Sequence, residues 1–93
     1  MNDLTDHARA RMRQRGIDAE ALERLLEFGR EAFDHRGHAT IVYFDKAARR
    51  RLERQADSAD RKQVQRISRM YAVLSNNGKV VTVGHRDRRI ARN

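Results

Sequence analysis

The chain has 93 residues, enough for one domain with a modest core. Charged residues make up 37% of it, and the mean hydropathy is −0.93. The absence of cysteine excludes disulfides, thiolate zinc sites and cysteine nucleophiles. No apolar run approaches the ~20 residues of a membrane span, and the first residues lack the apolar stretch of a signal peptide. We therefore expect a cytoplasmic protein with no membrane partner.

Two helices are predicted at the start of the chain, over residues 5–15 and 19–28. Each is preceded by a polar residue that can accept a hydrogen bond from the first turn, and each is followed by a glycine that ends it. These residues are Thr5 or Asp3 with Gly16 for the first helix, and Asp18 with Gly29 for the second. Ile17, just before the second helix, can pack against Leu22.

Two hairpins are predicted in the rest of the chain. The first joins a strand with a weak signal over Arg30–His35 to a strand over Ala39–Phe44 that is rich in aromatic and β-branched residues, across a turn at Arg36-Gly37. The second joins Tyr71–Ser75 to Lys79–His85 across Asn77-Gly78, a pair typical of a type I′ turn. Strict alternation along the last strand places Val81, Val83 and His85 on one face of the sheet, and Val80, Thr82, Gly84 and Arg86 on the other.

A basic helical segment separates the two hairpins. Asp45 caps a predicted helix over about 46–56, and a short fourth helix follows, with Val64, Ile67 and Met70 at helical spacing. The order of elements predicts an α+β domain in which two N-terminal helices pack on a four-stranded antiparallel sheet, with a basic helical insertion between the hairpins. One domain spans 1–93, with an ordered core over about 4–86 and a basic tail over 87–93 that we expect to fray.

The positive charge is concentrated in the second half of the chain. Residues 1–45 hold 7 arginines and 9 acidic residues, for a net charge of −2. Residues 46–93 hold 14 lysines and arginines and 4 acidic residues, for a net charge of +10. Arginine outnumbers lysine 18 to 3, and its planar fork fits a phosphate group. The second half therefore favours nucleic acid as a partner, with an acidic protein as the alternative.

Histidine and arginine are the residues that could carry chemistry. His7, Arg11 and Arg15 are four residues apart, so they line one face of the first helix, and His85 and Arg86 end the last strand. RNA cleavage without a metal needs a base, an acid and cations on the phosphate, and these residue types can supply them. In a purely structural interpretation, His7 caps or packs the helix and the arginines are surface charge.

Metal and cofactor sites are not expected. His35 and His38 flank the first turn with only Asp34 nearby, which is a poor set of ligands. The chain has no glycine-rich phosphate loop.

Base stacking would depend on Tyr43, Tyr71 and a few phenylalanines.

Two segments of the chain carry a recognisable pattern. They are residues 4–18, LTDHARARMRQRGID, and residues 77–86, NGKVVTVGHR. The first is similar to the opening Thr-x-His-Ala-x-x-Arg-Met-x-x-Arg-Gly-Ile pattern, and the second to the closing hairpin and Val-Thr-Val-Tyr-Arg-like strand, of a bacterial family of domains of unknown function, numbered 4258. The resemblance covers about 4–86. Gly84-His85 stands where the family usually has a tyrosine, so this aromatic is absent from the last strand.

The resemblance implies a fold and an activity. The family is grouped with the barnase–EndoU–colicin–RelE domains, so it implies a RelE-like architecture and makes metal-independent, toxin-type RNA cleavage a candidate activity. Carried over by position, the motif residues are His7, Arg11, Arg15, Thr82 and Arg86. A small acidic antitoxin-like protein is the partner that a toxin of this kind implies.

Taken together, the sequence predicts a RelE-like domain that engages RNA on the open sheet face and on the helix over 46–56. His7 is the candidate general base or acid, and Arg11, Arg15 and Arg86 are candidate phosphate clamps. The candidate nucleic-acid-binding residues are Arg49, Arg50, Arg54, Thr82 and His85. The enzymatic version is a metal-independent endoribonuclease, and the alternative is a non-enzymatic module of the same fold that binds nucleic acid or protein.

Overall fold

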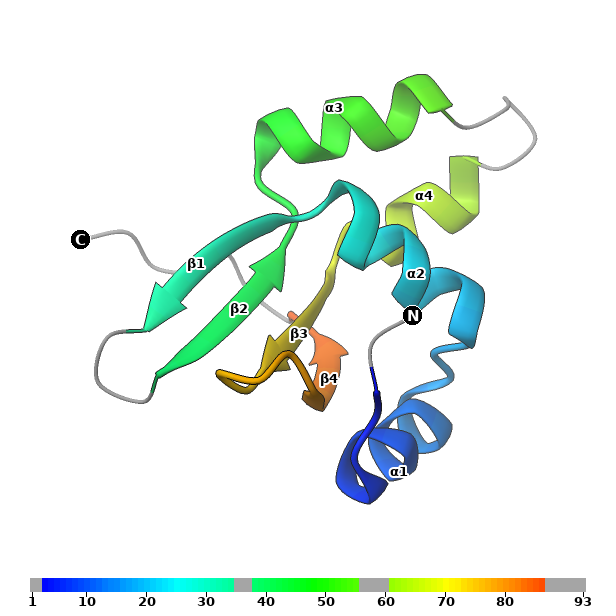
Figure 1. The fold of residues 1–93 in the computed structure, drawn as a ribbon. Helices are drawn as coiled ribbons and strands as arrows, with labels where there is room; N and C mark the ends of the chain where they lie inside the picture. Colours follow the sequence, from blue (N-terminus) through cyan, green and yellow to red (C-terminus); the bar gives the residue numbers. More distant parts are fainter. Residues whose placement is uncertain (1–2, 35–37, 56–60, 87–93) are drawn as a thin grey trace.

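The computed structural model describes residues 3–34, 38–55 and 61–86, which form an α+β unit (Figure 1). Along this part of the chain two helices come first, then a hairpin, two further helices and a second hairpin, as predicted. The helices are α1 (Asp6–Arg15), α2 (Ala19–Phe28), α3 (Lys46–Gln55) and α4 (Arg61–Ile67), and the strands are β1 (Arg30–Asp34), β2 (Ala39–Tyr43), β3 (Met70–Leu74) and β4 (Val80–His85). His35 and the predicted tail over 87–93 lie outside the described residues.

The four strands form one antiparallel sheet in the order β1-β2-β3-β4, so each strand lies beside the next one in the sequence. At the centre of the sheet Ala72 lies between Val42 of β2 and Val83 of β4, and all three side chains are buried. This central row belongs to the face that the helices cover. The α+β class with a four-stranded sheet is therefore confirmed.

The helices bury that one face of the sheet. α2 contacts β2 and β3, α1 lies alongside β4, and α3 and α4 pack on α2 (Figure 1). α3 and α4 therefore complete the core and are not an appendage. The buried apolar residues that hold the layers together are Ala8, Met12, Ile17, Ala21, Leu22, Leu25, Val42, Phe44, Ala48, Leu52, Val64, Ile67, Met70, Ala72, Leu74, Val80 and Val83.

α1 is fixed at both ends by the residues that the sequence indicates. The Thr5 hydroxyl accepts a hydrogen bond from the backbone N–H of Ala8 at 3.1 Å, and Gly16 ends the helix in the left-handed region with φ 66°. Residues just before α1 pair with the outer edge of β4, since the N–H of Val80 donates to Asp3 O at 2.8 Å and the N–H of Thr5 donates to Val80 O at 3.0 Å. The N-terminal segment thus forms a single bridge at the start of this edge of the sheet.

α2 begins after the predicted cap, Asp18, and ends at Gly29. Close packing, and not a left-handed backbone, accounts for the glycine. The Asp18 carboxylate accepts from the N–H of Ala21 at 2.8 Å. Gly29 has φ −69°, so it is not a left-handed stop. A Cβ at this position would stand 2.5 Å from Leu25 O and 2.7 Å from a methyl of Val42. Glycine is needed there because α2 approaches β2 closely.

The second hairpin turns differently from the type I′ prediction. Gly78 has φ 84°, whereas Asn77 is not among the described residues with positive φ, which a type I′ turn would require. The N–H of Ser75 donates to Lys79 O at 2.8 Å, and the N–H of Gly78 donates to Ser75 O at 2.9 Å. These bonds enclose a three-residue loop with glycine in the left-handed position, which is a common alternative in hairpins.

β4 also departs from strict alternation. Val73 pairs with Thr82, but Leu74 pairs with Val80, so a bulge follows the turn. As a result Val80 and Val83 are both buried, although alternation assigns them to opposite faces.

The short helix before β3 ends earlier than predicted, at Ile67. Val64 and Ile67 lie on the buried side of α4, but Met70 opens β3.

Candidate nucleic-acid interface

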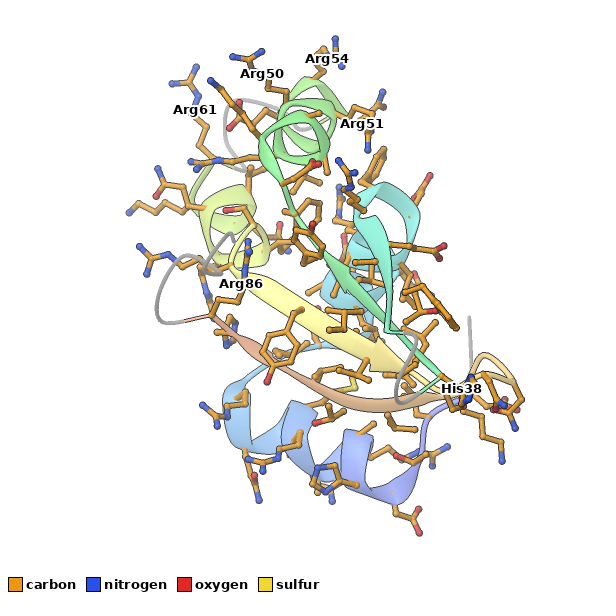
Figure 2. The ribbon with its side chains drawn as sticks, turned by 90° about the vertical axis from the view of Figure 1, so that its left-hand side faces the viewer. His38, Arg50, Arg51, Arg54, Arg61 and Arg86 are labelled. Atoms are coloured by element: carbon orange, nitrogen blue, oxygen red, sulfur yellow. The ribbon has the colours of Figure 1, made fainter. Side chains whose placement is uncertain are left out.

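No described helix or strand covers the second face of the sheet. Figure 2 shows this face toward the viewer, with α3 above it and α1 below it. The register assigns to it Ile41 and Tyr43 of β2, Tyr71 and Val73 of β3, and Thr82 of β4, and all five are partly exposed. We call this the open face.

The two tyrosines lie side by side on the open face. Tyr43 pairs with Tyr71, and Tyr71 pairs with Gly84 on the next strand. A Cβ on Gly84 would stand 3.0 Å from both Cε1 and the hydroxyl oxygen of Tyr71. The Tyr71 side chain therefore lies down across β4, over the position that glycine leaves empty. An aromatic side chain thus occupies this part of β4 although it comes from β3.

Arg86 spans the end of the sheet instead of reaching into solvent. Its Nη2 donates to Phe44 O at 2.8 Å and to Ser68 O at 3.4 Å, and its own N–H donates to Arg69 O at 2.7 Å. Its guanidinium carbon lies 5.5 Å from the centre of the Tyr43 ring. The predicted phosphate clamp is therefore partly buried and already bonded to carbonyl groups.

Arg30 and Asp45 join the sheet to α3. The Arg30 guanidinium donates to Asp45 at 2.9 Å, and the other oxygen of Asp45 accepts from the N–H of Ala48 at 2.8 Å. This backbone hydrogen bond, followed by the one from Arg30, lowers the pKa of Asp45. Asp45 also raises the pKa of Arg30. The cap predicted for the third helix is confirmed, and it fixes α3 at the end of the sheet that carries Tyr43.

α3 presents its arginines to solvent. Arg50 and Arg54 are exposed and have no acidic partner within the described chain, whereas Arg49 pairs with Glu53 at 3.1 Å. Arg61, at the start of α4, is exposed as well and lies with Arg50 and Arg54 at the top of Figure 2. Arg51 turns to the other side of α3, where it donates to Phe28 O at 3.3 Å. We call Arg50, Arg54 and Arg61 the arginine ridge.

α1 carries the third group of predicted residues. His7, Arg11 and Arg15 share one face of the helix, and the Nε–H of Arg11 is directed at His7 Nε2 at 3.5 Å. His7 and Arg15 are exposed and Arg11 is partly exposed. α1 borders the sheet at β4, whereas Arg86 is bonded to the ends of β2 and α4. The structure therefore groups three of the four candidate catalytic residues and leaves Arg86 in a different setting.

A comparison with known families gives one match for this chain. The family model described as Domain of unknown function (DUF4258) matches residues 4–85. The chain belongs to this family. Neither a curated protein nor a solved structure gives a match. The DUF4258 membership predicted from the two motifs is thus confirmed, and the RelE-like grouping stays a prediction.

In this DUF4258 chain Thr82 and His85, the two predicted binding residues on β4, lie on opposite faces of the sheet. Thr82 pairs with Val73 on the open face. His85 pairs with Met70 on the helix side, where it lines a shallow hollow together with Asp18 and Arg66. One strand of RNA on the open face could contact Thr82 but not His85.

Sequence reasoning about this DUF4258 chain named both tyrosines but missed the role of Gly84. It also missed Arg61 and the Arg30–Asp45 pair. The signal for Gly84 was present, since the predicted hairpin brings Tyr71 close to it, and an aromatic residue often covers a glycine on a neighbouring strand. No local signal indicated the Arg30–Asp45 pair, because the two residues are 15 apart in the sequence, at the two ends of a hairpin.

Two further observations on the described residues complete the site. No group of three His, Asp or Glu side chains there could hold a metal ion, and His35 lies outside this part of the chain. None of the helices found there is long and apolar enough to cross a membrane.

Proposed function

We propose that this domain binds RNA through the arginine ridge and the open face of the sheet. The observation that carries the proposal is the ridge itself. Arg50, Arg54 and Arg61 are exposed, gather at one end of the molecule and have no acidic partner among the described residues. Arginine in this state binds phosphate groups through its planar fork.

The position of the ridge supports the same proposal. α3 starts three residues after Tyr43, at the end of the open face that carries the tyrosines. Arg50 and Arg54 lie about one and two helical turns further along it. An RNA strand whose phosphates contact α3 could then continue along the sheet. Phosphate contacts supply most of the affinity in such complexes, and contacts to bases add preference.

The test is RNA affinity measured by fluorescence anisotropy over a range of salt concentrations. A 5′-labelled single-stranded RNA should bind more weakly as salt rises, by about 0.7 log units of affinity per log unit of salt for each phosphate neutralised. The double variant Arg50→Glu, Arg54→Glu should weaken binding and lower that slope by about 1.4. Both positions are exposed, so the variant should remain folded.

A matched control changes the same net charge elsewhere. Arg9 on α1 and Lys79 just before β4 are both exposed. α1 and the start of β4 lie at the opposite end of the molecule from α3 (Figure 1). The double variant Arg9→Glu, Lys79→Glu should therefore change the salt slope little. Binding that does not depend on salt, or no binding at low salt, would contradict the proposal and favour an acidic protein, such as an antitoxin-like partner.

A second candidate function is metal-independent cleavage of the bound RNA. The observation in its favour is the contact between Arg11 and His7 on the exposed face of α1. This places a group able to transfer a proton beside a group able to hold a phosphate. Without such activity, the same surfaces serve a non-enzymatic binding module.

A further inference from the structure

We propose that Tyr71, together with the Arg86 guanidinium that lies over Tyr43, forms a stacking platform for unpaired bases, so that the RNA bound by this domain is single-stranded. This inference rests on the proposed function and adds to it the class of RNA. We call Tyr43, Tyr71 and Arg86 the stacking platform.

The first step is the placement of the two rings. Tyr43 and Tyr71 are register partners on neighbouring strands of the open face, and both are partly exposed. They are the only tyrosines of the chain, which has no tryptophan. Both tyrosines of the chain are thus at one place. The exposed aromatic residue Phe33, in contrast, pairs with Thr40 and belongs to the other side of the sheet.

The second step is the way in which Gly84 shapes the platform. Any side chain there would meet the far end of the Tyr71 ring, since a Cβ would stand only 3.0 Å from it. Glycine lets the ring lie across β4 and widens the aromatic area beyond β3. A flat area of this kind suits bases of any identity, because every base has a π-face.

The third step is the role of Arg86. Its guanidinium is 5.5 Å from the centre of the Tyr43 ring and is tied to Phe44 O at 2.8 Å. A fixed guanidinium plane stacks on a base in the same way as an aromatic ring does. Arg86 therefore fits the platform better than the role of a mobile phosphate clamp.

The fourth step concerns the state of the RNA. The arginine ridge alone would attract the phosphates of single and double strands alike. Stacking on side chains needs bases that have left a helix, because paired bases are already stacked on one another. A stacking platform at the end of the sheet where α3 begins therefore selects an unpaired strand.

The experiment compares three labelled RNA probes of one length by fluorescence anisotropy. They are a single strand, a blunt duplex and an abasic single strand, which keeps the phosphates but has no bases. The wild-type protein should bind the single strand most tightly. Tyr71→Leu, which keeps an apolar side chain, should weaken single-strand binding by roughly 5- to 150-fold and leave the other two probes unchanged. Phe33→Leu, which removes an aromatic residue from the other side, is the matched control and should change none of the three.

Tyrosine emission provides a measurement that needs no variant. Because both tyrosines belong to the platform, the emission of the protein reports this site alone. After correction for absorbance with free tyrosine, the single strand should quench it, and the abasic strand should not. Gly84→Ala is the second variant if Tyr71→Leu fails to fold, since one methyl group displaces the ring and should also weaken single-strand binding.

The outcomes separate this inference from the proposed function. If the abasic strand or the duplex binds as tightly as the single strand, or if Tyr71→Leu changes nothing, the stacking platform is wrong and RNA binding by the ridge stands. If none of the three probes binds at low salt, the proposed function is wrong, and the inference that rests on it is overturned as well.

Discussion

The guanidinium of Arg86 lies over the ring of Tyr43, although the two residues belong to the ends of β4 and β2 and β3 runs between those strands. The same guanidinium donates to Phe44 O on one side and to Ser68 O on the other. One side chain thus joins the end of β4 to the residues that follow β2 and precede β3, at the end of the sheet where α3 begins.

Replacement of Arg86 should destabilise the fold. Hydrogen bonds from a charged group contribute about 1.5–3 kcal/mol and a cation–π contact about 0.5–2 kcal/mol, and partial exposure reduces both. For Arg86→Ala we expect a loss of about 2 kcal/mol, which lowers the melting temperature of a domain of this size by about 8–16 °C. Arg86→Lys should recover only part of this because it lacks the planar fork. A melting temperature for Arg86→Ala within about 2 °C of the wild type would show that Arg86 is free to act as a phosphate clamp.

Asp45 should make the stability of the fold depend on pH in the acidic range. The N–H of Ala48, and then Arg30, hold its pKa below the ordinary value of 3.8 in the folded state. Protonation therefore favours the unfolded chain. The contribution of Asp45 is full above pH 3.8 and is lost as the pH falls through the lower pKa of the folded state.

Two variants of Asp45 separate the cap from the ion pair. Asp45→Ala should cost about 1 kcal/mol at neutral pH. Asp45→Asn should cost less, because asparagine also caps helices and the pair with Arg30 is exposed. Urea unfolding at a series of pH values checks both expectations. A constant difference between wild type and Asp45→Ala down to about pH 2 would contradict the assignment of this pH dependence to Asp45.

The two glycines that end the first helices should respond differently to alanine. Gly16 has φ 66° and open space around its Cβ position, so Gly16→Ala costs only the backbone strain of about 1–2 kcal/mol. A Cβ at Gly29 would meet the backbone oxygen of Leu25 at 2.5 Å. It would also meet a methyl of Val42 at 2.7 Å. Gly29→Ala should therefore cost about 3 kcal/mol, since the backbone at the end of α2 must rearrange relative to Leu25 and Val42 must move as well. Denaturant unfolding of the two variants side by side gives the order, and an equal cost would mean that the end of α2 accommodates the methyl group without strain.

Replacement of His7 tests the cleavage hypothesis. If His7 transfers a proton in RNA cleavage, His7→Ala lowers the rate by about 10²–10⁴-fold and leaves RNA affinity unchanged. Cleavage should continue in a chelator, and the products should carry 2′,3′-cyclic phosphate ends. End mapping of the products, together with the melting temperature of the same variant, provides the measurement. A rate that falls only in proportion to the folded fraction would assign His7 a structural role.

Local chemistry accounts for what the sequence predicted well. The caps at Thr5, Asp18 and Asp45 each act within three residues, and all three are present as expected. Glycines after the helices and turn residues between the strands likewise located the first two helices and the second hairpin. The errors came where the same local signal is compatible with more than one geometry, or where packing between segments decides the outcome. The bulge in β4 depends on the length of the turn, which Asn77-Gly78 alone does not fix.

The candidate site was less predictable than the fold because its parts meet across strands. Spacing along one helix was enough to group His7 with Arg11. Nothing in the spacing indicated that Arg86 would turn toward Tyr43, 43 residues earlier. The Gly84-His85 pair looked like the loss of an aromatic residue until the register placed Tyr71 over Gly84.

The pairing of the segment before α1 with Val80 affects how this sheet could associate. It forms one bridge, between Leu4 and Val80, at the start of the outer edge of β4, and α1 contacts the same strand. A sheet that is open at both edges can add copies of itself without limit, as fibres do. A strand added beside β4 would first have to displace this bridge, whereas β1 has no neighbouring strand on its outer side among the described residues. The short N-terminal segment therefore opposes growth of the sheet at one of its two edges and leaves β1 as the edge where a second copy could pair.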